Sequence, residues 1–284
     1  MRRTSPVSDS SVPGTASGRP QCLPAQVFKR RFGSPTLAWL AAGALIATAS
    51  VPVTARSSGF SAFGSPRCEV APPKPAPKRY VVAAVGDSLT DTRVGGGRYL
   101  KYLSQRCPES RFDAYGVGGQ RTEHMRWRFL HDVFGIGAAR KPPAYTHVIV
   151  LGGINDLSAG SLSDSRTGRI RDNLRYMYRE AHERGLEVVA VEVPPWGLLR
   201  GVKDARVAAT SELNSWIAGR PSHGEVDYAV DLGPVLRCDE RPGVLPGDLC
   251  PSYRRFPTDR IHWNAAGHKR VAEVLYQSVF SDCR

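Results

Sequence analysis

The chain has 284 residues, of which 41% are hydrophobic, enough for one large folded domain or two small ones. Its formal net charge is +13, but ten of the 39 basic residues and only two of the 26 acidic residues fall within residues 1–78. The remainder is mildly basic and has no basic run with interleaved aromatic residues, so we expect no nucleic-acid partner.

The first 55 residues are predicted to direct export. Residues 1–26 are polar and rich in Ser, Pro and Gly, a composition typical of disorder. A basic cluster at residues 29–31 then precedes an apolar segment, residues 37–51, which small residues follow as in a cleavage site. This segment is shorter than the ~20 residues of a membrane-spanning helix. We therefore expect a signal peptide and a secreted or cell-surface protein, with an uncleaved membrane anchor at residues 37–51 as the alternative.

Six cysteines suit an exported protein better than a reduced cytosolic one. None of them is spaced as CxxC, so the pattern gives little support for a zinc or thioredoxin-type site. Cys238 and Cys250 flank a loop rich in Pro and Gly and are the best candidates for a disulfide. Among Cys68, Cys107 and Cys283 we expect one disulfide and one free thiol. Cys22 would be removed when the signal peptide is cleaved.

Residues 56–79 are rich in Ser, Gly, Pro and Lys and predict an extended linker. The folded domain is therefore expected to cover residues 80–284, where short apolar runs predict strands. The first run is continuous, as is typical of a strand buried on both faces. The five predicted strands are residues 80–85, 111–117, 147–151, 186–193 and 226–232.

Helical patterns alternate with these strands. They predict helices at residues 167–184, 203–218 and about 264–280. Such alternation predicts a parallel sheet covered on both faces, whose ligands bind beyond the carboxyl ends of the strands. The glycine run at residues 95–97 predicts a flexible loop.

The sequence GDSLT, residues 86–90, follows the first predicted strand. It places Ser88 where a helix is expected to begin, with its hydroxyl at the carboxyl edge of the sheet and near the positive end of that helix. Ser after Asp is also a common helix cap, so the segment alone is weak evidence for a nucleophile. The chain contains no GxSxG, which excludes the nucleophile elbow of the α/β-hydrolases.

The sequence DRIH, residues 259–262, comes just before the last predicted helix. In a tight turn Asp259 can accept a hydrogen bond from Nδ1–H of His262, which leaves Nε2 to take a proton from Ser88. An isolated DxxH is more often a capping Asp beside a surface His. A metal site built from His262 and His268 is disfavoured because a spacing of six places them on different helix faces. We expect no metal and no cofactor.

The sequence GGIND, residues 152–156, follows the third predicted strand. The side-chain amide of Asn155 can point at a developing oxyanion, although Asn and Gly are also common turn residues. At the end of the second strand, residues 115–122 read YGVGGQRT. A glycine in this stretch would let a backbone N–H approach a substrate oxygen closely.

These segments, in this order, resemble the SGNH (GDSL) hydrolases, a family of serine esterases and lipases. The family's invariant Ser, Gly, Asn and His, and its triad acid, match Ser88, Gly119, Asn155, His262 and Asp259. The match at Gly119 is the loosest, because the family often has Ser-Gly there, so Gly116 and Gly118 stay open as substitutes. The resemblance covers residues 80–280 and implies a three-layer α/β/α fold with a five-stranded parallel sheet in the order 2-1-3-4-5.

The resemblance also implies an ester hydrolase that works through an acyl-enzyme. Ser88 would be the nucleophile and His262, oriented by Asp259, the general base. The backbone N–H groups of Ser88 and Gly119 and the side chain of Asn155 would form the oxyanion hole.

Other residues near these segments have expected supporting roles. Asp87 and Asp156 are expected to hold the loops in place. Trp196, after the fourth strand, and Trp263, where relatives often have Pro, are candidate pocket residues that could instead fill the core.

The expected substrate is a small-molecule, lipid or carbohydrate ester. Short acyl esters or O-acetylated carbohydrate are favoured, because no long apolar lid segment interrupts the domain. Two alternatives stay open: an O-acyltransferase with the same triad, and a non-catalytic wall- or carbohydrate-binding module. The oligomeric state does not follow from the sequence.

Overall fold

The computed structural model describes residues 76–158, 164–197, 205–238 and 247–284. The predicted disorder, export segment and Cys68, with most of the predicted linker, lie outside these residues. Within the described ranges, no helix combines the length and apolar character needed to cross a membrane.

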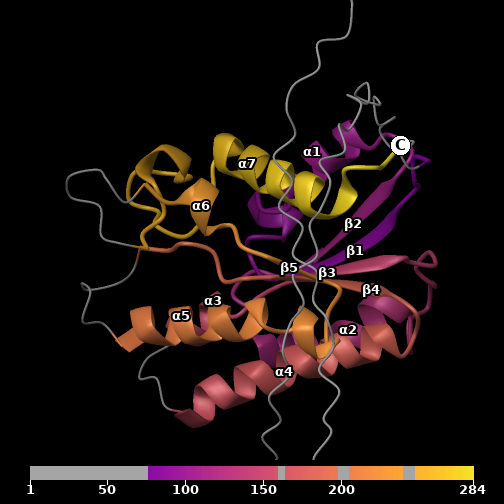
Figure 1. The fold of residues 1–284 in the computed structure, drawn as a ribbon, viewed down its shortest axis with the longest axis horizontal. Helices are drawn as coiled ribbons and strands as arrows, with labels where there is room; N and C mark the ends of the chain where they lie inside the picture. The colour runs from indigo at the N-terminus through magenta and orange to yellow at the C-terminus, as the bar shows by residue number, and fades with distance from the viewer. Residues whose placement is uncertain (1–75, 159–163, 198–204, 239–246) are drawn as a thin grey trace, which may run out of the picture. The chain divides into compact units, whose positions relative to one another are not determined.

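Five parallel strands form a sheet at the centre of the domain (Figure 1), in the order β2-β1-β3-β4-β5. They are β1 (Val81–Gly86), β2 (Arg111–Gly116), β3 (His147–Leu151), β4 (Glu187–Val191) and β5 (Tyr228–Val230). All five residues of β3 are buried, which explains its continuous apolar sequence. The predicted sheet and strand order are confirmed. β5 is shorter than predicted because, at the edge of the sheet, it pairs with β4 over only three residues.

Helices cover both faces of the sheet (Figure 1). One face carries α1 (Arg98–Arg106), α7 (Ala265–Leu275) and the short α6 (Gly233–Leu236). The other carries α2 (Thr122–Phe134), α4 (Asp164–His182), α5 (Ala205–Ala218) and the short α3 (Ile154–Ser158). The three predicted helices are α4, α5 and α7, the last continued by a π-helical segment, Tyr276–Phe280. Short 3-10 segments at Thr92–Val94, Pro221–His223 and Pro251–Tyr253 complete the list.

Each face of the sheet has its own apolar core. Alternation along β1 divides its residues between the two cores, because successive side chains of a strand point to opposite faces. Ala83 and Val85 pack with α2, α4 and α5, whereas Val82 and Ala84 pack with α1 and α7.

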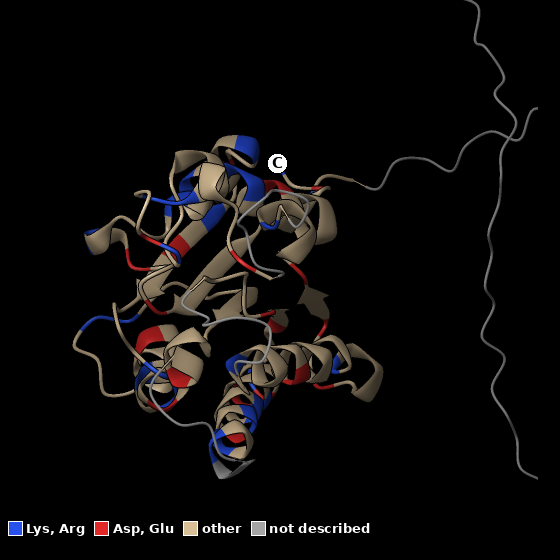
Figure 2. Ribbon diagram, turned by 90° about the vertical axis from the view of Figure 1, so that its left-hand side faces the viewer, with Lys and Arg blue, Asp and Glu red and all other residues tan. Residues whose placement is uncertain are grey.

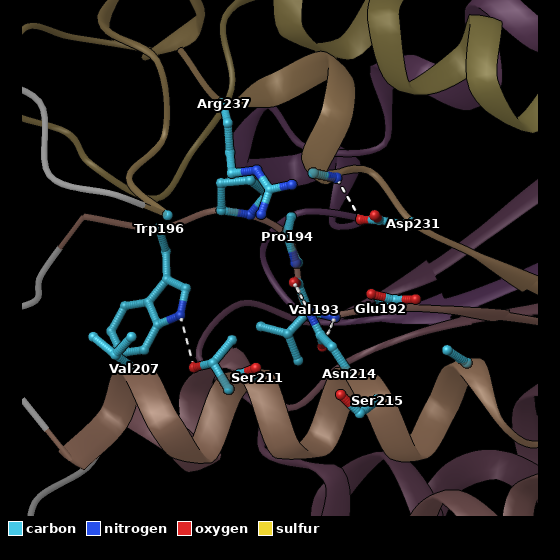
Figure 3. Close-up of a pocket in the computed structure, with 15 residues that line it drawn as sticks. Glu192, Val193, Pro194, Trp196, Val207, Ser211, Asn214, Ser215, Asp231 and Arg237 are labelled. Carbon is cyan, nitrogen blue, oxygen red and sulfur yellow. Dashed lines mark hydrogen bonds between the residues drawn. The ribbon is translucent and has the colours of Figure 1, made fainter. Parts of the chain in front are cut away.

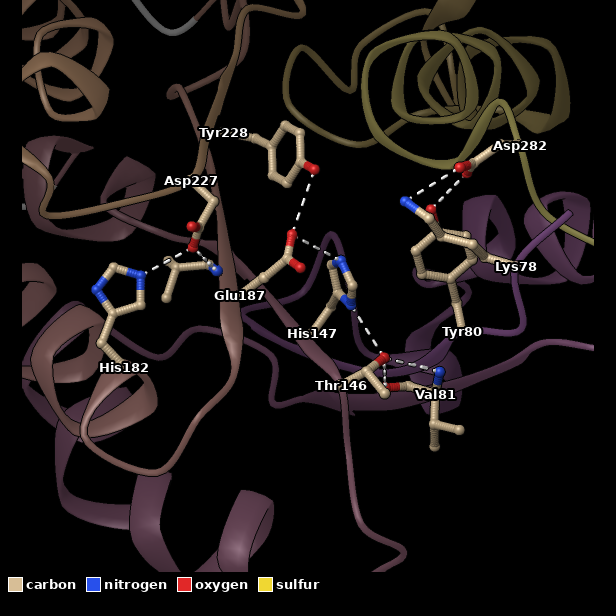
Figure 4. Close-up of polar contacts among 11 residues, drawn as sticks. Lys78, Tyr80, Val81, Thr146, His147, His182, Glu187, Asp227, Tyr228 and Asp282 are labelled. Atoms are coloured by element: carbon tan, nitrogen blue, oxygen red, sulfur yellow. Dashed lines mark hydrogen bonds and ion pairs between the residues drawn. The ribbon is translucent and has the colours of Figure 1, made fainter. Parts of the chain in front are cut away.

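The chain closes on itself at the amino ends of the strands. The backbone N–H of Lys78 donates to the carbonyl of Asp282 (2.7 Å), and the N–H of Arg284 donates to the carbonyl of Lys78 (2.8 Å). The hydroxyl of Tyr80 also donates to the carboxylate of Asp282, at 2.5 Å (Figure 4). Lys78, within the stretch expected to be linker, therefore contacts the folded domain.

A polar cluster on the same edge joins three strands. His147 of β3 lies 3.3 Å from the carboxylate of Glu187 on β4, which also accepts a hydrogen bond from the Tyr228 hydroxyl of β5 (Figure 4). The amino ends of the strands are thus held together by side-chain contacts as well as by the backbone hydrogen bonds of the sheet. The loops that carry the motif residues lie at the carboxyl ends.

Two disulfides crosslink the described chain. Cys238 and Cys250 are bonded, as the sequence predicted. The second bond joins Cys107, at the end of α1, to Cys283, next to the C-terminus. It settles the pairing that the sequence left open.

The two disulfides should differ in their effect on stability. Cys107–Cys283 spans 176 residues and Cys238–Cys250 spans 12, so the chain-entropy estimate gives about 5 and about 3 kcal/mol. We expect Cys107→Ala/Cys283→Ala to lower the urea midpoint more than Cys238→Ala/Cys250→Ala does, in parallel oxidised samples. Equal losses, or a larger loss for the short loop, would contradict this ranking.

Candidate active site

The residues singled out from the sequence meet at the carboxyl edge of the sheet. Ser88 follows β1, Gly119 follows β2 and Asn155 follows β3 by only a few residues, and β1 lies between β2 and β3. The loop that holds Asp259 and His262 leads into α7 and reaches the same edge.

A line of hydrogen bonds joins Ser88, His262 and Asp259. Nε2 of His262 lies 2.9 Å from Oγ of Ser88, across 174 residues of sequence. Nδ1 of the same ring lies 3.0 Å from Oδ2 of Asp259. These distances allow a proton to pass from the hydroxyl to the ring while the carboxylate fixes the ring's orientation.

The carboxylate of Asp259 is held in its ionised form. Burial alone would raise its pKa, but backbone N–H groups of His262 (2.9 Å) and Ile261 (3.1 Å) donate to Oδ1. These hydrogen bonds and the adjacent imidazole hold the pKa of Asp259 below its usual range.

The loop of Asp259 and His262 is tied to its surroundings on both sides. Arg260 forms an ion pair with the fully buried Asp248, and its carbonyl accepts the N–H of Gly197 at 2.8 Å. Asp248 precedes Cys250 by two residues, so the Cys238–Cys250 disulfide lies next to this anchor. Asn264 caps α7 by accepting the N–H of Gly267 (3.0 Å), which fixes the start of the helix just after His262.

Ser88 lies in a tight turn, and no helix begins there. The N–H groups of Thr90 and Asp91 both donate to the carbonyl of Asp87, and the N–H of Leu89 donates to its carboxylate. The next α-helix begins only at Arg98. The expectation of a helix N-terminus at Ser88 was therefore wrong, because a 3-10 turn and the glycine run intervene.

The glycine run at residues 95–97 packs tightly against the turn of Ser88. A Cβ on Gly96 would lie 2.1 Å from the carbonyl oxygen of Ser88. The N–H of Gly97 donates to the carbonyl of Leu89 at 2.9 Å. The expectation of a flexible loop was wrong, because this close approach of two backbones requires a residue without a side chain.

Two backbone N–H groups in the loops after β1 and β2 remain available. In the described part of the chain, the N–H groups of Ser88 and Gly119 donate to no acceptor. The N–H of Gly118 donates to Oδ2 of Asp91 (2.9 Å), and Gly116 belongs to β2 and packs against the backbone of Asp91. Gly118 has already used its donor, whereas the N–H of Gly119, in the loop after β2, is unused.

Asn155 is linked to the loop of Gly119. Its Nδ2 donates to the carbonyl of Gln120 at 2.9 Å, which leaves the second N–H of the amide available. Gly119 has a positive φ of 73°, a conformation that favours glycine. The amide of Asn155 and the backbone of Gly119 therefore belong to one hydrogen-bonded unit.

Asp91 is a residue of this site that the sequence analysis missed. It is buried, and it binds the N–H of Gly118 with one oxygen and the guanidinium of Arg93 with both. The hydrogen bonds from Arg93 are the main reason that the pKa of Asp91 falls to about 2. The signal was present in the sequence, since Asp91 directly follows the GDSLT segment.

Asp87 and Asp156 are both buried beside the site. Burial raises the pKa of Asp87 to about 7, and the nearby charge of Asp156 also raises it. The hydrogen bond from Leu89 and the charge of Arg128 lower it, but by less. Burial also raises the pKa of Asp156, whose two oxygens accept the N–H and the hydroxyl of Thr122, each at 2.9 Å. These contacts with the loops suit the supporting roles expected of both residues.

Both candidate pocket tryptophans are buried. Trp263 lies beside Ser88 and His262 at a small hollow and packs edge-on against Tyr99 and His268. Trp196 lies at one wall of a separate cavity of about 460 Å³ beyond β4 and β5, where its indole N–H donates to Thr210 (Figure 3). Each thus fills part of the core and also borders a hollow.

The match to a family model decides the classification. The model of the GDSL-like lipase/acylhydrolase family matches residues 84–270, about two thirds of the chain. The chain belongs to this family. The match spans every segment that resembled the family in sequence, and ester hydrolysis is the family's chemistry.

Solved structures show the same fold at low sequence identity. An acetylxylan esterase from Geobacillus stearothermophilus superposes with a TM-score of 0.54 and 18% identity, covering 72% of this chain and 96% of that one. A lipase/acylhydrolase from Enterococcus faecalis gives 0.54 and 15%, covering 72% and 97%. A GDSL-like lipase from Bacteroides thetaiotaomicron gives 0.52 and 17%, covering 70% and 86%. No curated protein sequence matches the chain.

The buried Asp87 should make stability depend on pH. Its pKa is about 7 in the folded protein against 3.8 for the free side chain, so between these values the folded state keeps a proton that the unfolded chain releases. The contribution of Asp87 to the free energy of unfolding therefore falls as pH rises from about 4 to about 7, then stays constant. We expect Asp87→Asn, whose amide oxygen can still accept from Leu89, to flatten this part of the profile. Parallel profiles in urea titrations from pH 4 to 8 would contradict the assignment.

Proposed function

We propose that this protein is an exported serine hydrolase that cleaves carboxylic esters through an acyl-enzyme. The hydrogen bond between His262 and Ser88 at 2.9 Å is the observation that carries the proposal. Asp259, ionised and bonded to the far side of the ring, orients it and stabilises its charged form.

In the first step, Oγ of Ser88 attacks the ester carbonyl while His262 takes its proton. The developing oxyanion is met by the unused N–H groups of Ser88 and Gly119 and the second N–H of Asn155. The tetrahedral intermediate then collapses, and His262 gives the proton to the leaving alcohol. In the second step, His262 removes a proton from water, whose oxygen attacks the acyl carbon. The bond from that carbon to Ser88 Oγ then breaks, His262 returns the proton to Oγ, and the acid leaves.

Access of water favours hydrolysis over transfer to a second alcohol. The side chain of His262 is 33% exposed, so water can approach the ring that must activate it. An acyltransferase needs the acyl-enzyme to be protected from water, which this exposure does not favour. The unused donors and the intact relay likewise favour an enzyme over a non-catalytic binding module.

The proposed substrates are short acyl esters or O-acetylated carbohydrate. The hollow beside Ser88 and His262 is small, with the buried Leu89 and Trp263 among the residues at its walls, and it offers no room for a long acyl chain. The acetylxylan esterase with the same fold acts on an acetylated carbohydrate, which is consistent with this choice.

Export is supported by the two disulfides. Such bonds persist in oxidising compartments outside the cytosol. The predicted signal segment before the domain agrees with this proposal.

Loss of the Ser88 hydroxyl should abolish turnover. We expect Ser88→Ala to lower kcat on p-nitrophenyl acetate by at least about 10⁴-fold, because no other group supplies the nucleophile. Ser104→Ala, which removes a hydroxyl bonded to Leu100 on α1, is the matched control and should keep the wild-type rate. The proposed function would be refuted if Ser88→Ala kept the wild-type turnover. It would also be refuted if the wild-type protein hydrolysed no p-nitrophenyl ester, whether acetate, butyrate or long-chain.

Removal of the Asn155 amide should slow the chemical step. Loss of one oxyanion donor typically costs about 10²–10³-fold in kcat, and we expect this for Asn155→Ala with KM little changed. Because Asn155 also bonds Gln120, thermal unfolding is measured on the same samples. A large fall in melting temperature with kcat preserved would assign Asn155 a structural role instead.

A further inference from the structure

A second cavity near the proposed active site is lined by arginines. It measures about 280 Å³ and lies where the first turns of α2 and α4 approach each other. Its walls include Arg121, Arg126, Trp127 and Arg169, with Glu123 and Asp172 among the acidic residues. Arg166 also lines it.

The cavity shares its walls with the loops of the oxyanion donors. Arg121 comes two residues after Gly119, and the wall residue Asp156 directly follows Asn155. The hydrogen bond from Asn155 to Gln120 joins these two loops. The cavity therefore adjoins the two loops that carry Gly119 and Asn155.

Four arginines and three acidic residues line the cavity, so its walls carry a formal net charge of +1. In the described part of the chain, Arg121, Arg126 and Arg169 form no ion pair. Asp156 is buried and bonded to Thr122, and Asp172 lies 3.7 Å from Arg175. Glu123 is the one carboxylate of the cavity wall for which the described residues supply neither a hydrogen-bond donor nor a basic partner.

About half of the arginines in the described ranges pair with acids. On the same helices, Arg128 binds Asp132 and Arg171 binds Glu212. Figure 2, which views the carboxyl edge, shows basic and acidic positions interspersed over these helices. Three guanidinium groups that form no ion pair among the described residues thus border one cavity, and a bound anion would pair with them.

One of these arginines is already held in place. Nη1 of Arg126 donates to Oδ1 of the buried Asn173 at 3.3 Å, and its guanidinium lies 4.5 Å from the ring centre of Tyr176. Such anchoring leaves most of its donors available while reducing the entropy lost on binding.

An exposed aromatic ring borders the same cavity. The side chain of Trp127 is 69% exposed and is supported edge-on by His124, with ring centres 5.5 Å apart. A flat indole face next to guanidinium groups suits a ring that has C–H groups on one face and a negative charge at its edge. A sugar carrying a carboxylate or phosphate has this combination.

We propose that this cavity binds an acidic sugar unit, so that the natural substrate is an ester of an acidic carbohydrate. The proposal rests on the esterase function proposed above and narrows its substrate. The arginines would bind the carboxylate or phosphate through paired N–H donors, a geometry that guanidinium provides. Trp127 would pack on the sugar ring.

The test compares two O-acetylated glycans with a small neutral ester. Acetate release is measured from acetylated oligogalacturonide, which is acidic, and from acetylated xylo-oligosaccharide, which is neutral. We expect kcat/KM to be about 10–100-fold higher for the acidic glycan at low ionic strength, as one or two charge-assisted hydrogen bonds give. Salt should reduce this preference, since exposed charges are screened. A phosphorylated acetyl-sugar extends the test to phosphate.

Two double variants and one single variant test whether the preference for the acidic glycan comes from this cavity. Arg126→Gln/Arg169→Gln should lower the ratio of kcat/KM for acidic over neutral glycan by about tenfold or more. Lys269→Gln/Arg270→Gln removes the same charge from exposed positions on α7, across the sheet, and should keep the ratio. Trp127→Ala should lower kcat/KM on both glycans relative to p-nitrophenyl acetate.

The outcomes separate this proposal from the proposed function. No Ser88-dependent hydrolysis of p-nitrophenyl acetate would refute the esterase itself. Ser88-dependent hydrolysis with equal kcat/KM on both glycans would refute only the acidic-sugar site. An acidic preference that both double variants reduce equally would also refute the site, because it would reflect overall charge.

Discussion

The hydrogen bond between His262 and Ser88 depends on the whole architecture of the domain. The two residues lie 174 positions apart, and each is on a loop at the carboxyl edge of the sheet. β1 must lie between β2 and β3 for the turn of Ser88 to meet the loops of Gly119 and Asn155. His262 lies just before the start of α7. This helix packs against α1 on one face of the sheet, and that packing places His262 at the carboxyl edge. A change in strand order would separate the turn of Ser88, the loops of Gly119 and Asn155, and His262 from one another.

Crosslinks near both ends of the strands support this arrangement. The backbone pairing of Lys78 with the C-terminal residues and the Cys107–Cys283 bond fix the ends of the domain. The Cys238–Cys250 bond stands next to Asp248, whose ion pair with Arg260 holds the loop of His262. Each crosslink therefore reduces the freedom of a segment that carries or precedes a site residue, which limits the entropy lost on ordering the site.

The sequence predicted the strands and the positions of the site residues because both follow from local patterns. A strand buried on both faces is a continuous apolar run, and motif residues directly after such runs must lie at one edge of a parallel sheet. The turn of Ser88 and the packing of Gly96 were mispredicted, because both depend on backbone contacts between segments. The choice of Gly119 depends likewise on a hydrogen bond from Gly118 to Asp91, 27 residues away.

Four aspartates lie around Ser88 and His262, and their surroundings distinguish them better than their residue type. Asp91 and Asp156 use their oxygens on backbone N–H groups, a guanidinium and a hydroxyl, and so hold loops in place. Asp87 is buried and favours its protonated form up to about neutral pH, which makes it a poor partner for a charged imidazole. Within the described residues, Asp259 alone is both ionised and in contact with the ring of His262. The role of an acid at such a site thus follows from which donors its oxygens already serve.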